Sequence, residues 1–409
     1  MDSEFVVGLD AGTTMVSVVI GEVGRAGAIK IVGVGSSESE GMKKGVVVNI
    51  EEAAACVSRA TREAEKMAGV EIQGVCASLS SPDIKSFNSR GVVALSPGTH
   101  EIMEGDVERV TAISQNVTLP ADREVIQAVG QDYIVDTHGG IRDPIGMAAT
   151  RLGAEMHIVT GLAMPLENFS KVLRKAGLVI VNLVFEPIAS ALAVCTADER
   201  ENGCLVIDVG GGVTSYMLYH GGCVRSSGVI PAGGINITND LAIGLRLPFP
   251  AAEELKRSHG IALASMAGED EEVVLPGIEN RGSGKIRAQM IAAVIEPRCE
   301  ELFTMVKEAV STDRQIPVLG GGVVLTGGAS QVRGLTGVAE QVFDLPVRCG
   351  RPSNLEGLAE IVSDPSFSTV IGLLIHERDS LPRDSGREAG MLGRLKSIAE
   401  KLKSVASWS

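Results

Sequence analysis

The chain opens with short apolar runs that predict strands, followed by an amphipathic helix. Apolar runs at Phe5–Asp10, Val16–Glu22 and Ile29–Ser36 predict three consecutive strands joined by short turns. Over Ile50–Met67 the apolar positions recur every three or four residues, which predicts a helix with one apolar stripe. Val75–Ser80 predicts another buried strand, so the chain begins as an α/β protein.

The pattern changes between about residues 84 and 159. Strand-like runs at Val92–Leu95, Val125–Asp136 and Thr150–Thr160 surround a single helical run at Asp106–Asn116. Pro, Gly and Asn stand at the joints between them. Three strands around one helix predict a small α+β subdomain inserted at residues 83–160, which is a common way of adding an interaction surface to a scaffold.

Alternating strands and helices return after residue 165. Leu178–Phe185 predicts a strand and Ala288–Ser311 a long amphipathic helix. Shorter helices are predicted at Leu166–Ala176, Ile188–Thr196, Ala251–Ser258, Gln331–Phe343 and Ser368–His376. A chain of 409 residues exceeds what one hydrophobic core usually supports, so two lobes are expected.

Composition narrows the possible partners and compartments. The net charge of −14 argues against nucleic acid as a partner, because a duplex requires a basic face. Seven cysteines without a C-x-x-C pair favour reduced thiols in a cytosolic protein over a disulfide framework. Asp2 and Glu4 stand where a secretory signal would be basic, and the apolar runs are shorter than a bilayer span.

Two stretches share a pattern of strand, acid and glycine. Leu205–Ser215 reads L-V-I-D-V-G-G-G-V-T-S, and Phe5–Thr14 reads F-V-V-G-L-D-A-G-T-T. Glycines let backbone N–H groups approach an anion closely, and a carboxylate beside phosphates needs Mg²⁺ between them. An ordinary hairpin after a core strand explains either stretch alone. Two copies 198 residues apart instead predict a duplicated phosphate site that uses Asp10 and Asp208.

A third strand leads into glycines at Gly320–Ser330, and the order of motifs resembles the actin-like ATPase superfamily. D-A-G-T-T from Asp10 and D-V-G-G-G from Asp208 resemble its two phosphate loops, L-T-G-G-A-S from Leu325 its adenosine loop, and E-P-I-A-S from Glu186 its first connecting helix. A-E-E-L-K from Ala252 resembles its nucleoside-contacting segment. The resemblance implies the ligands ATP and Mg²⁺, with water-mediated metal binding by Asp10 and Asp208. The implied nucleotide site contains Asp10, Gly12, Thr13, Thr14, Asp208, Gly210, Gly211, Gly212, Gly233, Gly234, Glu253, Lys256, Gly327, Gly328 and Ser330.

Glu186 is the candidate catalytic residue. It stands at a strand-to-helix turn, where a carboxylate can position the water that attacks a γ-phosphate. An equally good alternative is structural, since an acid beside proline at a helix start is stabilised by the helix dipole. We therefore expect a protein that is not primarily an enzyme and hydrolyses ATP slowly at most.

The place of the insertion indicates a particular family. Actin and the heat-shock chaperones insert a subdomain between the third strand and the first helix, but here that connection, Ser37–Asn49, is short. The extra residues come after Val75–Ser80, as in the family of the bacterial cell-division protein FtsA, which D-P-I-G-M-A-A-T-R-L from Asp143 and V-I-E-P-R from Val294 also resemble. The pilus-assembly protein PilM shares the rearrangement.

This resemblance implies a two-lobed actin-like (ribonuclease-H-like) α/β fold. The expected divisions are a first-lobe core (1–82, 161–190 and 361–377), the insertion (83–160), a second-lobe core (191–226 and 301–360), a smaller second-lobe subdomain (227–300), a linker (378–390) and a terminal helix (391–409).

The last residues predict a membrane-binding helix behind a polar linker. Glu377–Gly390 is charged and lacks an apolar period. In the segment that follows, one helical face collects Met391, Leu392, Leu395, Ile398, Leu402 and Val405, flanked by Arg394, Lys396, Lys401 and Lys403, with Trp408 near the end. Such a helix lies in a membrane interface and attracts anionic lipids. Docking of the helix on its own core or on a partner is the alternative.

The family resemblance implies a cell-division adaptor at the cytoplasmic face of the membrane. Such a protein polymerises, tethers the tubulin-like protein FtsZ through the FtsZ C-terminal peptide, and recruits other division proteins. Lys285, Arg287 and Arg298 are candidates for attracting an acidic peptide, although solvated charges are the simpler interpretation of each. A PilM-like pilus-assembly protein is one alternative function. A sugar or acetate kinase is another, but we find no motif for a substrate base.

Overall fold

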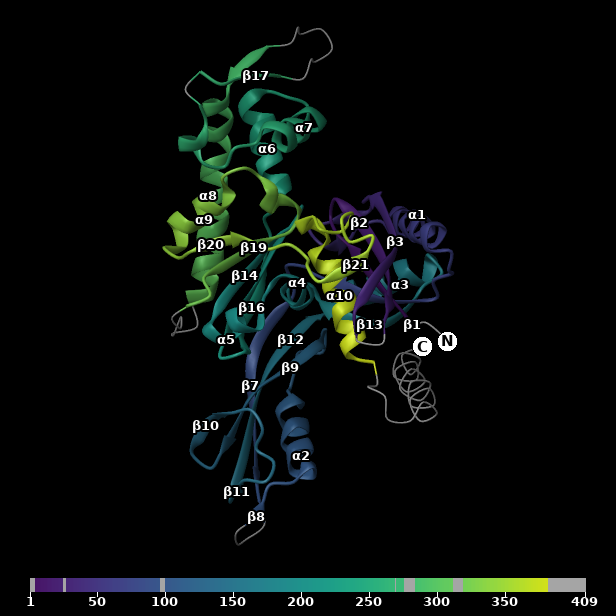
Figure 1. Ribbon diagram of the computed structural model, residues 1–409, viewed down its shortest axis with the longest axis vertical. Coiled ribbons are helices and arrows are strands. Elements are labelled where there is room, and N and C mark those ends of the chain that lie inside the picture. Colours follow the sequence, from purple (N-terminus) through teal and green to yellow (C-terminus); the bar gives the residue numbers. More distant parts are fainter. Residues whose placement is uncertain are drawn as a thin grey trace.

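The computed structural model describes residues 4–24, 27–95, 100–268, 270–275, 284–311 and 319–381. Two mixed α/β lobes lie beside each other, and smaller parts extend from them in opposite directions (Figure 1). The predicted α/β class and two-lobed arrangement are confirmed.

The first lobe is built on a six-stranded sheet. Its strands are β1 (Glu4–Ala11), β2 (Met15–Val23), β3 (Ile29–Glu38), β6 (Gly74–Leu79), β13 (Val179–Phe185) and β21 (Leu355–Gly357), in the order β13-β6-β1-β2-β3-β21. The first three are antiparallel neighbours, whereas β6 and β13 run parallel to β1. The strands predicted from the N-terminal apolar runs are therefore confirmed, and most extend a residue or two beyond their predicted ends.

Helices α1 (Ile50–Ala68), α3 (Ala163–Lys175), α4 (Glu186–Val194) and α10 (Ser368–Asp379) pack around this sheet. Asn49 starts α1 by accepting hydrogen bonds from the backbone of Glu51 and Glu52, and Gly69 ends it in a left-handed conformation. Helix α1 packs closely on β3, where a Cβ at Gly35 would lie 1.9 Å from the Ala60 carbonyl oxygen. A short ribbon, β4 (Met42–Lys43) and β5 (Val46–Val47), precedes α1.

The second lobe repeats the strand order of the first. Its strands are β14 (Cys204–Val209), β15 (Thr214–His220), β16 (Cys223–Ile230), β19 (Val323–Thr326) and β20 (Val347–Cys349), in the order β16-β15-β14-β19-β20. Strands β14, β15 and β16 are antiparallel neighbours, and β19 and β20 run parallel to β14. Apart from the additional edge strand β21, the two sheets thus share one topology, which is what a duplicated unit predicts.

The second lobe contains the helices α5 (Ala197–Asn202), α6 (Gly234–Leu245), α7 (Phe249–His259), α8 (Ala288–Ser311) and α9 (Leu335–Phe343). Three short 3-10 turns are η1 (Ala264–Met266), η2 (Gly328–Gln331) and η3 (Pro365–Phe367). Helices α6 and α7 and the ribbon β17 (Glu272–Val274) and β18 (Lys285–Arg287) form the end of the molecule drawn at the top of Figure 1. Helix α8 has the bounds that the sequence predicts.

The insertion lies at the opposite end. It contains β7 (Lys85–Ala94), β9 (Arg123–Val135), β10 (His138–Ile141) and β12 (Arg151–Leu162) in the order β10-β9-β12-β7, with α2 (Glu104–Gln115) and a ribbon of β8 (His100–Glu101) and β11 (Ala148–Ala149). The prediction of three strands was therefore incomplete. Strand β7 begins seven residues earlier than predicted, because its first half, K-S-F-N-S-R, is mostly polar.

The insertion also packs against the second lobe. Strands β7 and β9 contact β16, and the buried His157 imidazole bridges Asn88 Oδ1 and Ser227 Oγ, each at 2.7 Å. Arg225 pairs with Asp132 at 2.7 Å across the same boundary. The insertion is therefore fixed to both lobes.

Two predicted boundaries near the C-terminal end are wrong: the helix expected at Gln331–Phe343 begins only at Leu335, and the polar linker begins later than expected. The charged stretch places the start of the linker at Glu377, and the expected division of the chain into subdomains places it at residue 378. In the structure, α10 continues through Asp379. Glu377 is buried and accepts a hydrogen bond from Asn182 Nδ2 at 2.6 Å, which fixes the end of the helix to β13. Residues 382–390 and the predicted membrane helix, 391–409, lie outside the described residues.

Candidate functional site

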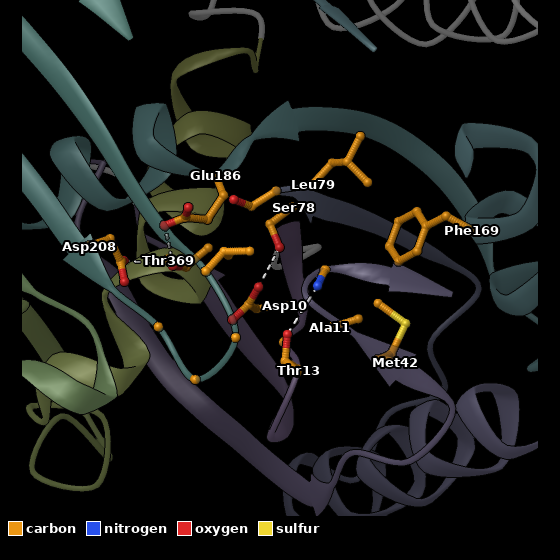
Figure 2. Close-up of a pocket in the computed structure, with 17 residues that line it drawn as sticks. Asp10, Ala11, Thr13, Met42, Ser78, Leu79, Phe169, Glu186, Asp208 and Thr369 are labelled. Atoms are coloured by element: carbon orange, nitrogen blue, oxygen red, sulfur yellow. Dashed lines mark hydrogen bonds between the residues drawn. The ribbon is translucent and has the colours of Figure 1, made fainter. Parts of the chain in front are cut away.

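A pocket lies between the two lobes where their first hairpins meet (Figure 2). The β1–β2 hairpin closes with a hydrogen bond from Gly12 N to Met15 O at 2.9 Å, and the β14–β15 hairpin with one from Gly210 N to Val213 O at 3.0 Å. The pocket encloses about 540 Å³, part of it open to solvent. Its lining residues are Asp10, Ala11, Gly12, Thr13, Met42, Gly45, Ser78, Leu79, Ser80, Phe169, Glu186, Asp208, Gly210, Gly211, Gly212, Val213 and Thr369.

The two hairpins approach each other so closely that the second requires glycine. A Cβ at Gly211 would lie 2.5 Å from the Thr14 side chain, and one at Gly212 would lie 2.5 Å from that of Thr13. The Thr13 hydroxyl also accepts a hydrogen bond from Gly45 N at 3.0 Å. The two predicted phosphate loops therefore face each other across the pocket.

Three carboxyl groups converge at one end of the pocket. Asp10 comes from β1, Asp208 from β14 and Glu186 from the first turn of α4, and Glu186 and Asp208 are only 8% and 7% exposed. Figure 2 shows Glu186, Asp208 and Thr369 on one side of the pocket, with Phe169 and Met42 on the other. The fold thus collects acids that are up to 198 residues apart in the chain.

Hydroxyl groups hold these acids in place. Ser78 Oγ donates to Asp10 Oδ1 at 2.5 Å. Ser190 Oγ lies 2.6 Å from Asp208 Oδ2 and 2.9 Å from Glu186 Oε1, so it links the two lobes' acids. Ser215 Oγ donates to the other Glu186 oxygen. Each carboxyl group is therefore oriented by at least one side chain.

The electrostatic state of the pocket follows from this crowding. Burial raises the pKa of Asp10 to about 6, an effect that the Ser78 hydrogen bond opposes and the nearby Asp208 charge adds to. Burial, followed by the Asp208 charge, raises the pKa of Glu186 well above its usual value. Burial likewise raises the pKa of Asp208. Acids that resist ionisation in this way lack a positive partner.

The residues present fit a hard divalent cation. The groups that converge are carboxyl and hydroxyl oxygens, which are the ligands that Mg²⁺ prefers. No lysine, arginine or histidine is among the described residues that line the pocket. A cation would therefore neutralise charge that the protein leaves uncompensated.

The predicted adenosine-side residues lie next to this pocket rather than in its lining. Gly327 (φ +86°) packs against Asp208 so closely that a Cβ would lie 2.1 Å from its Oδ1. The backbone N–H of Gly234 donates to Gly210 O at 2.9 Å, and a Cβ at Gly233 would lie 2.6 Å from the same oxygen. The start of α6 is therefore packed directly behind the second phosphate loop.

Glu253 and Lys256 belong to one buried polar network on α6 and α7. Lys256 Nζ donates to Glu253 Oε2 at 2.7 Å, to Thr238 Oγ1 at 2.9 Å and to Gly234 O at 3.1 Å. Within η2, Ser330 Oγ donates to Gly327 O at 2.7 Å, and Gly328 begins the same turn. The pair Glu253 and Lys256 and the turn that holds Gly327, Gly328 and Ser330 thus lie on different sides of the second phosphate loop.

Sequence reasoning missed the residues that support the acids. Ser78, Ser190, Ser215 and Thr369 carry hydroxyl groups at or beside the pocket, and Phe169 and Met42 form its apolar side. Ser190 and Ser215 stand within the recognised E-P-I-A-S and D-V-G-G-G-V-T-S stretches. Each follows the acid of its stretch by a few residues, and this closeness was a usable signal. No sequence signal identified Thr369, because it lies 161 residues from Asp208.

The three basic partner candidates do not form one patch. Lys285 Nζ pairs with Glu272 at 2.8 Å, and Arg298 pairs with Asp240 at 2.5 Å and also with Glu301. Arg287 is exposed on β18, opposite Glu272. Because Arg298 follows Arg287 by eleven residues, most of them in α8, it lies about 15 Å away along the helix. The ion pairs neutralise two of the three predicted cations.

None of the helices in the described ranges combines the length and the apolarity that crossing a bilayer requires.

Solved structures match the chain over most of its length. A type IV pilus biogenesis complex of PilM and PilN matches with a TM-score of 0.65 at 19% identity, covering 91% of this chain and 98% of that one. MreB5 of Spiroplasma citri bound to ADP matches with a TM-score of 0.56 at 16% identity, covering 92% and 97%. These similarities confirm the actin-like fold.

Sequence comparison is more specific. The family model of the cell-division protein FtsA matches residues 205–372, and the model of the SHS2 domain inserted in FtsA matches residues 82–160. The cell-division protein FtsA of Pseudomonas aeruginosa is 39% identical over 373 residues, which is 91% of this chain and 89% of that protein. With both family models and a relative of this similarity over nearly the whole chain, the protein belongs to the FtsA family of cell-division proteins.

Proposed function

We propose that this protein is an ATP-binding adaptor that polymerises on the cytoplasmic membrane, tethers the FtsZ ring to it and helps to recruit the division machinery. The observation that carries the nucleotide part is the cluster of Asp10, Glu186 and Asp208 between two facing glycine hairpins. The family membership of the chain supports the division role. ADP in a solved MreB5 structure of the same fold supports the choice of nucleotide.

In this proposal both lobes hold the phosphates. Backbone N–H groups of Gly12, Thr13 and Gly210–Gly212 bind phosphate oxygens, while Asp10 and Asp208 orient the waters of Mg²⁺. Mg²⁺ supplies the charge that neutralises the acids and the phosphates together. Gly327 and Gly328 lie where the backbone can approach the adenosine, beside the network of Glu253 and Lys256.

Glu186 has the position of a water-orienting residue, but its carboxyl oxygens already have hydrogen-bond partners in the protein. Its pKa is raised by burial and by Asp208, and both its oxygens accept hydrogen bonds from serines. Oxygens that two serine hydroxyls already occupy are less available to orient an attacking water. This supports hydrolysis that is slow at most, and it leaves the structural role at the start of α4 as the alternative.

The membrane part of the proposal depends on the sequence of residues 391–409. Four cations less Glu400 leave a net charge of +3, and each net charge contributes about 1 kcal/mol near an anionic leaflet. Burial of the apolar face adds several kcal/mol, since a fully buried side chain gives roughly 1.5–3 kcal/mol. One tail binds reversibly, whereas many tails on one polymer bind by effective concentration.

Sedimentation with liposomes tests the membrane part of the proposal, and calorimetry tests the nucleotide part. Wild-type protein should pellet with anionic liposomes and ATP, less with neutral liposomes and less at high salt. Leu395→Glu places a charge in the apolar face, so this variant should stay in the supernatant with unchanged ATP affinity. Asp208→Ala should weaken Mg-ATP binding at least tenfold in calorimetry. Pelleting of Leu395→Glu, or unchanged ATP affinity of Asp208→Ala, contradicts the corresponding part.

We also propose where partners bind. The subdomain of residues 227–300 docks the acidic FtsZ peptide, and Arg287 is its best candidate contact, because Lys285 and Arg298 already have acidic partners. Arg287→Glu should weaken peptide binding in fluorescence anisotropy; no change moves the site elsewhere. The insertion of residues 83–160 mediates self-association or recruits later division proteins rather than touching nucleotide, which its lack of glycine-acid loops supports. The FtsA family match disfavours the pilus-assembly and kinase alternatives.

A further inference from the structure

A second polar cluster lies in the first lobe, away from the nucleotide pocket. Cys76 on β6 and His376 and Glu377 on α10 each offer one ligand atom, and these atoms all lie within 4.8 Å of one another. Cys76 and Glu377 are buried and line a hollow of about 550 Å³ beside the start of β1, part of which is open to solvent. Within the described ranges this is the one such grouping of three metal-ligating side chains.

The chemistry of these donors is that of a zinc site. Cysteine sulfur, histidine nitrogen and glutamate oxygen are the three ligand types that Zn²⁺ accepts, whereas Mg²⁺ and Ca²⁺ prefer oxygen alone. A thiolate also disfavours hard cations, so the site is distinct in kind from the all-oxygen cluster at Asp10 and Asp208. The hollow leaves space beside Cys76 and Glu377 for a further, non-protein ligand.

Two features of the surroundings independently point to a ligand. His376 Nδ1 is buried and has no hydrogen-bond partner in the described part of the chain, which is costly unless something satisfies it. Glu377 Oε2 accepts a hydrogen bond from Asn182 Nδ2 at 2.6 Å, as carboxylates that bind metals usually do from a neighbouring residue. The simpler explanation, a buried cysteine that serves as a small hydrophobe, does not account for the unpartnered histidine nitrogen.

We propose that Cys76, His376 and Glu377 bind a zinc-class divalent cation. Binding replaces the thiol proton of Cys76, which passes to solvent, and places the metal–sulfur bond between β6 and α10.

The site would fasten two elements that also reach the nucleotide pocket. Strand β6 carries Cys76 near its beginning and Ser78, the hydrogen-bond donor to Asp10, two residues later. Helix α10 carries Thr369 of the pocket in its first turn and His376 and Glu377 in its last. A metal here holds the end of α10 on the sheet, so its binding should raise the unfolding temperature.

Cobalt(II) titration of the full-length, metal-stripped protein tests the proposal. We expect a one-to-one complex with a sulfur-to-cobalt charge-transfer absorption that added Zn²⁺ abolishes. Cys76→Ser should lose this absorption, whereas Cys299→Ser, which removes an equally buried thiol on α8, should keep it. Glu377→Gln and Asn182→Ala should each weaken Zn²⁺ binding by about tenfold or more.

A separate measurement guards against misfolded variants. Each variant should keep the wild-type circular dichroism and Mg-ATP affinity in the absence of zinc, and the wild type and Cys299→Ser should gain more thermal stability than the other variants when Zn²⁺ is added. If Cys76→Ser does not fold, Glu377→Gln carries the test. No sulfur-to-cobalt absorption in the wild type, or an absorption that survives Cys76→Ser, overturns the proposal.

Discussion

Replacing Asp10 by asparagine should stabilise the nucleotide-free protein and weaken its binding of Mg-ATP. Asparagine has nearly the shape of aspartate, and its side-chain oxygen can still accept the hydrogen bond that Ser78 donates at 2.5 Å. The change therefore removes a charge and little else. The charge is unfavourable in the folded protein, because burial raises the pKa of Asp10 from 3.8 to about 6.

The size and pH dependence of the effect follow from this shift. A difference of about 2 pKa units corresponds to roughly 3 kcal/mol as an upper value. Because the folded protein favours the protonated form, the penalty is absent below pH 3.8, grows as the pH rises toward 6 and is complete above it. Asp10→Asn should thus raise the free energy of unfolding by up to about 3 kcal/mol at pH 7.5 and by much less at pH 4.5.

Denaturant unfolding in EDTA at both pH values measures the effect. Asp136→Asn is the matched control, because that exposed carboxyl has its pKa lowered by hydrogen bonds from Thr150 and Arg151, so removing its charge should not stabilise the protein at pH 7.5. Calorimetry at pH 7.5 should show at least tenfold weaker Mg-ATP binding for Asp10→Asn. A stabilisation that is equal at the two pH values, or a loss of stability at pH 7.5, refutes the electrostatic reasoning.

Two further substitutions probe the same site. Gly327→Ala puts a Cβ 2.1 Å from Asp208 Oδ1 at a φ of +86°. Gly69→Ala is the control, because its Cβ meets nothing within 4 Å at a φ of +72°, and both variants share a backbone strain of about 1 kcal/mol or more. Gly327→Ala should therefore lose more stability in thermal unfolding, and more ATP affinity, than Gly69→Ala. Glu186→Gln should lower a measurable ATPase rate at least tenfold if the carboxylate orients water, and an unchanged rate in a phosphate-release assay makes the residue structural.

The elements with a clear apolar period were predictable from the sequence. Helix α8 has its predicted bounds, and the strands before Asp10 and Asp208 are where the apolar runs place them. Strands β15 and β16 were passed over, because β15 is buried at nearly every position and so shows no alternation of apolar and polar residues. The first half of β7 failed for the opposite reason, since most of its side chains are polar.

The site was predictable where the chemistry is local. The glycine hairpins could be recognised from the sequence, because the residues that shape each loop are consecutive. The charge pairs were not predictable, because Asp240 lies 58 residues from Arg298 and nothing in the sequence links them. Burial of Glu377 was missed in the same way, since Asn182, which holds it, is 195 residues away. Interactions of this kind are created by the fold and have no sequence pattern of their own.

The pocket depends on both lobes and on the helices between them. Each lobe supplies one aspartate, but Ser190 of α4 bonds to both Glu186 and Asp208, and its hydroxyl lies 2.9 Å from that of Thr369 on α10. A displacement of either helix therefore changes the support of the acids, and a change in the charge of the acids acts on both helices. Helix α4 is buried along nearly its whole length, so it cannot adjust without moving the lobes that cover it. A cation and nucleotide that neutralise this cluster would thus favour one relative position of the two lobes, and if the chain polymerises as proposed, this coupling would make its assembly depend on nucleotide.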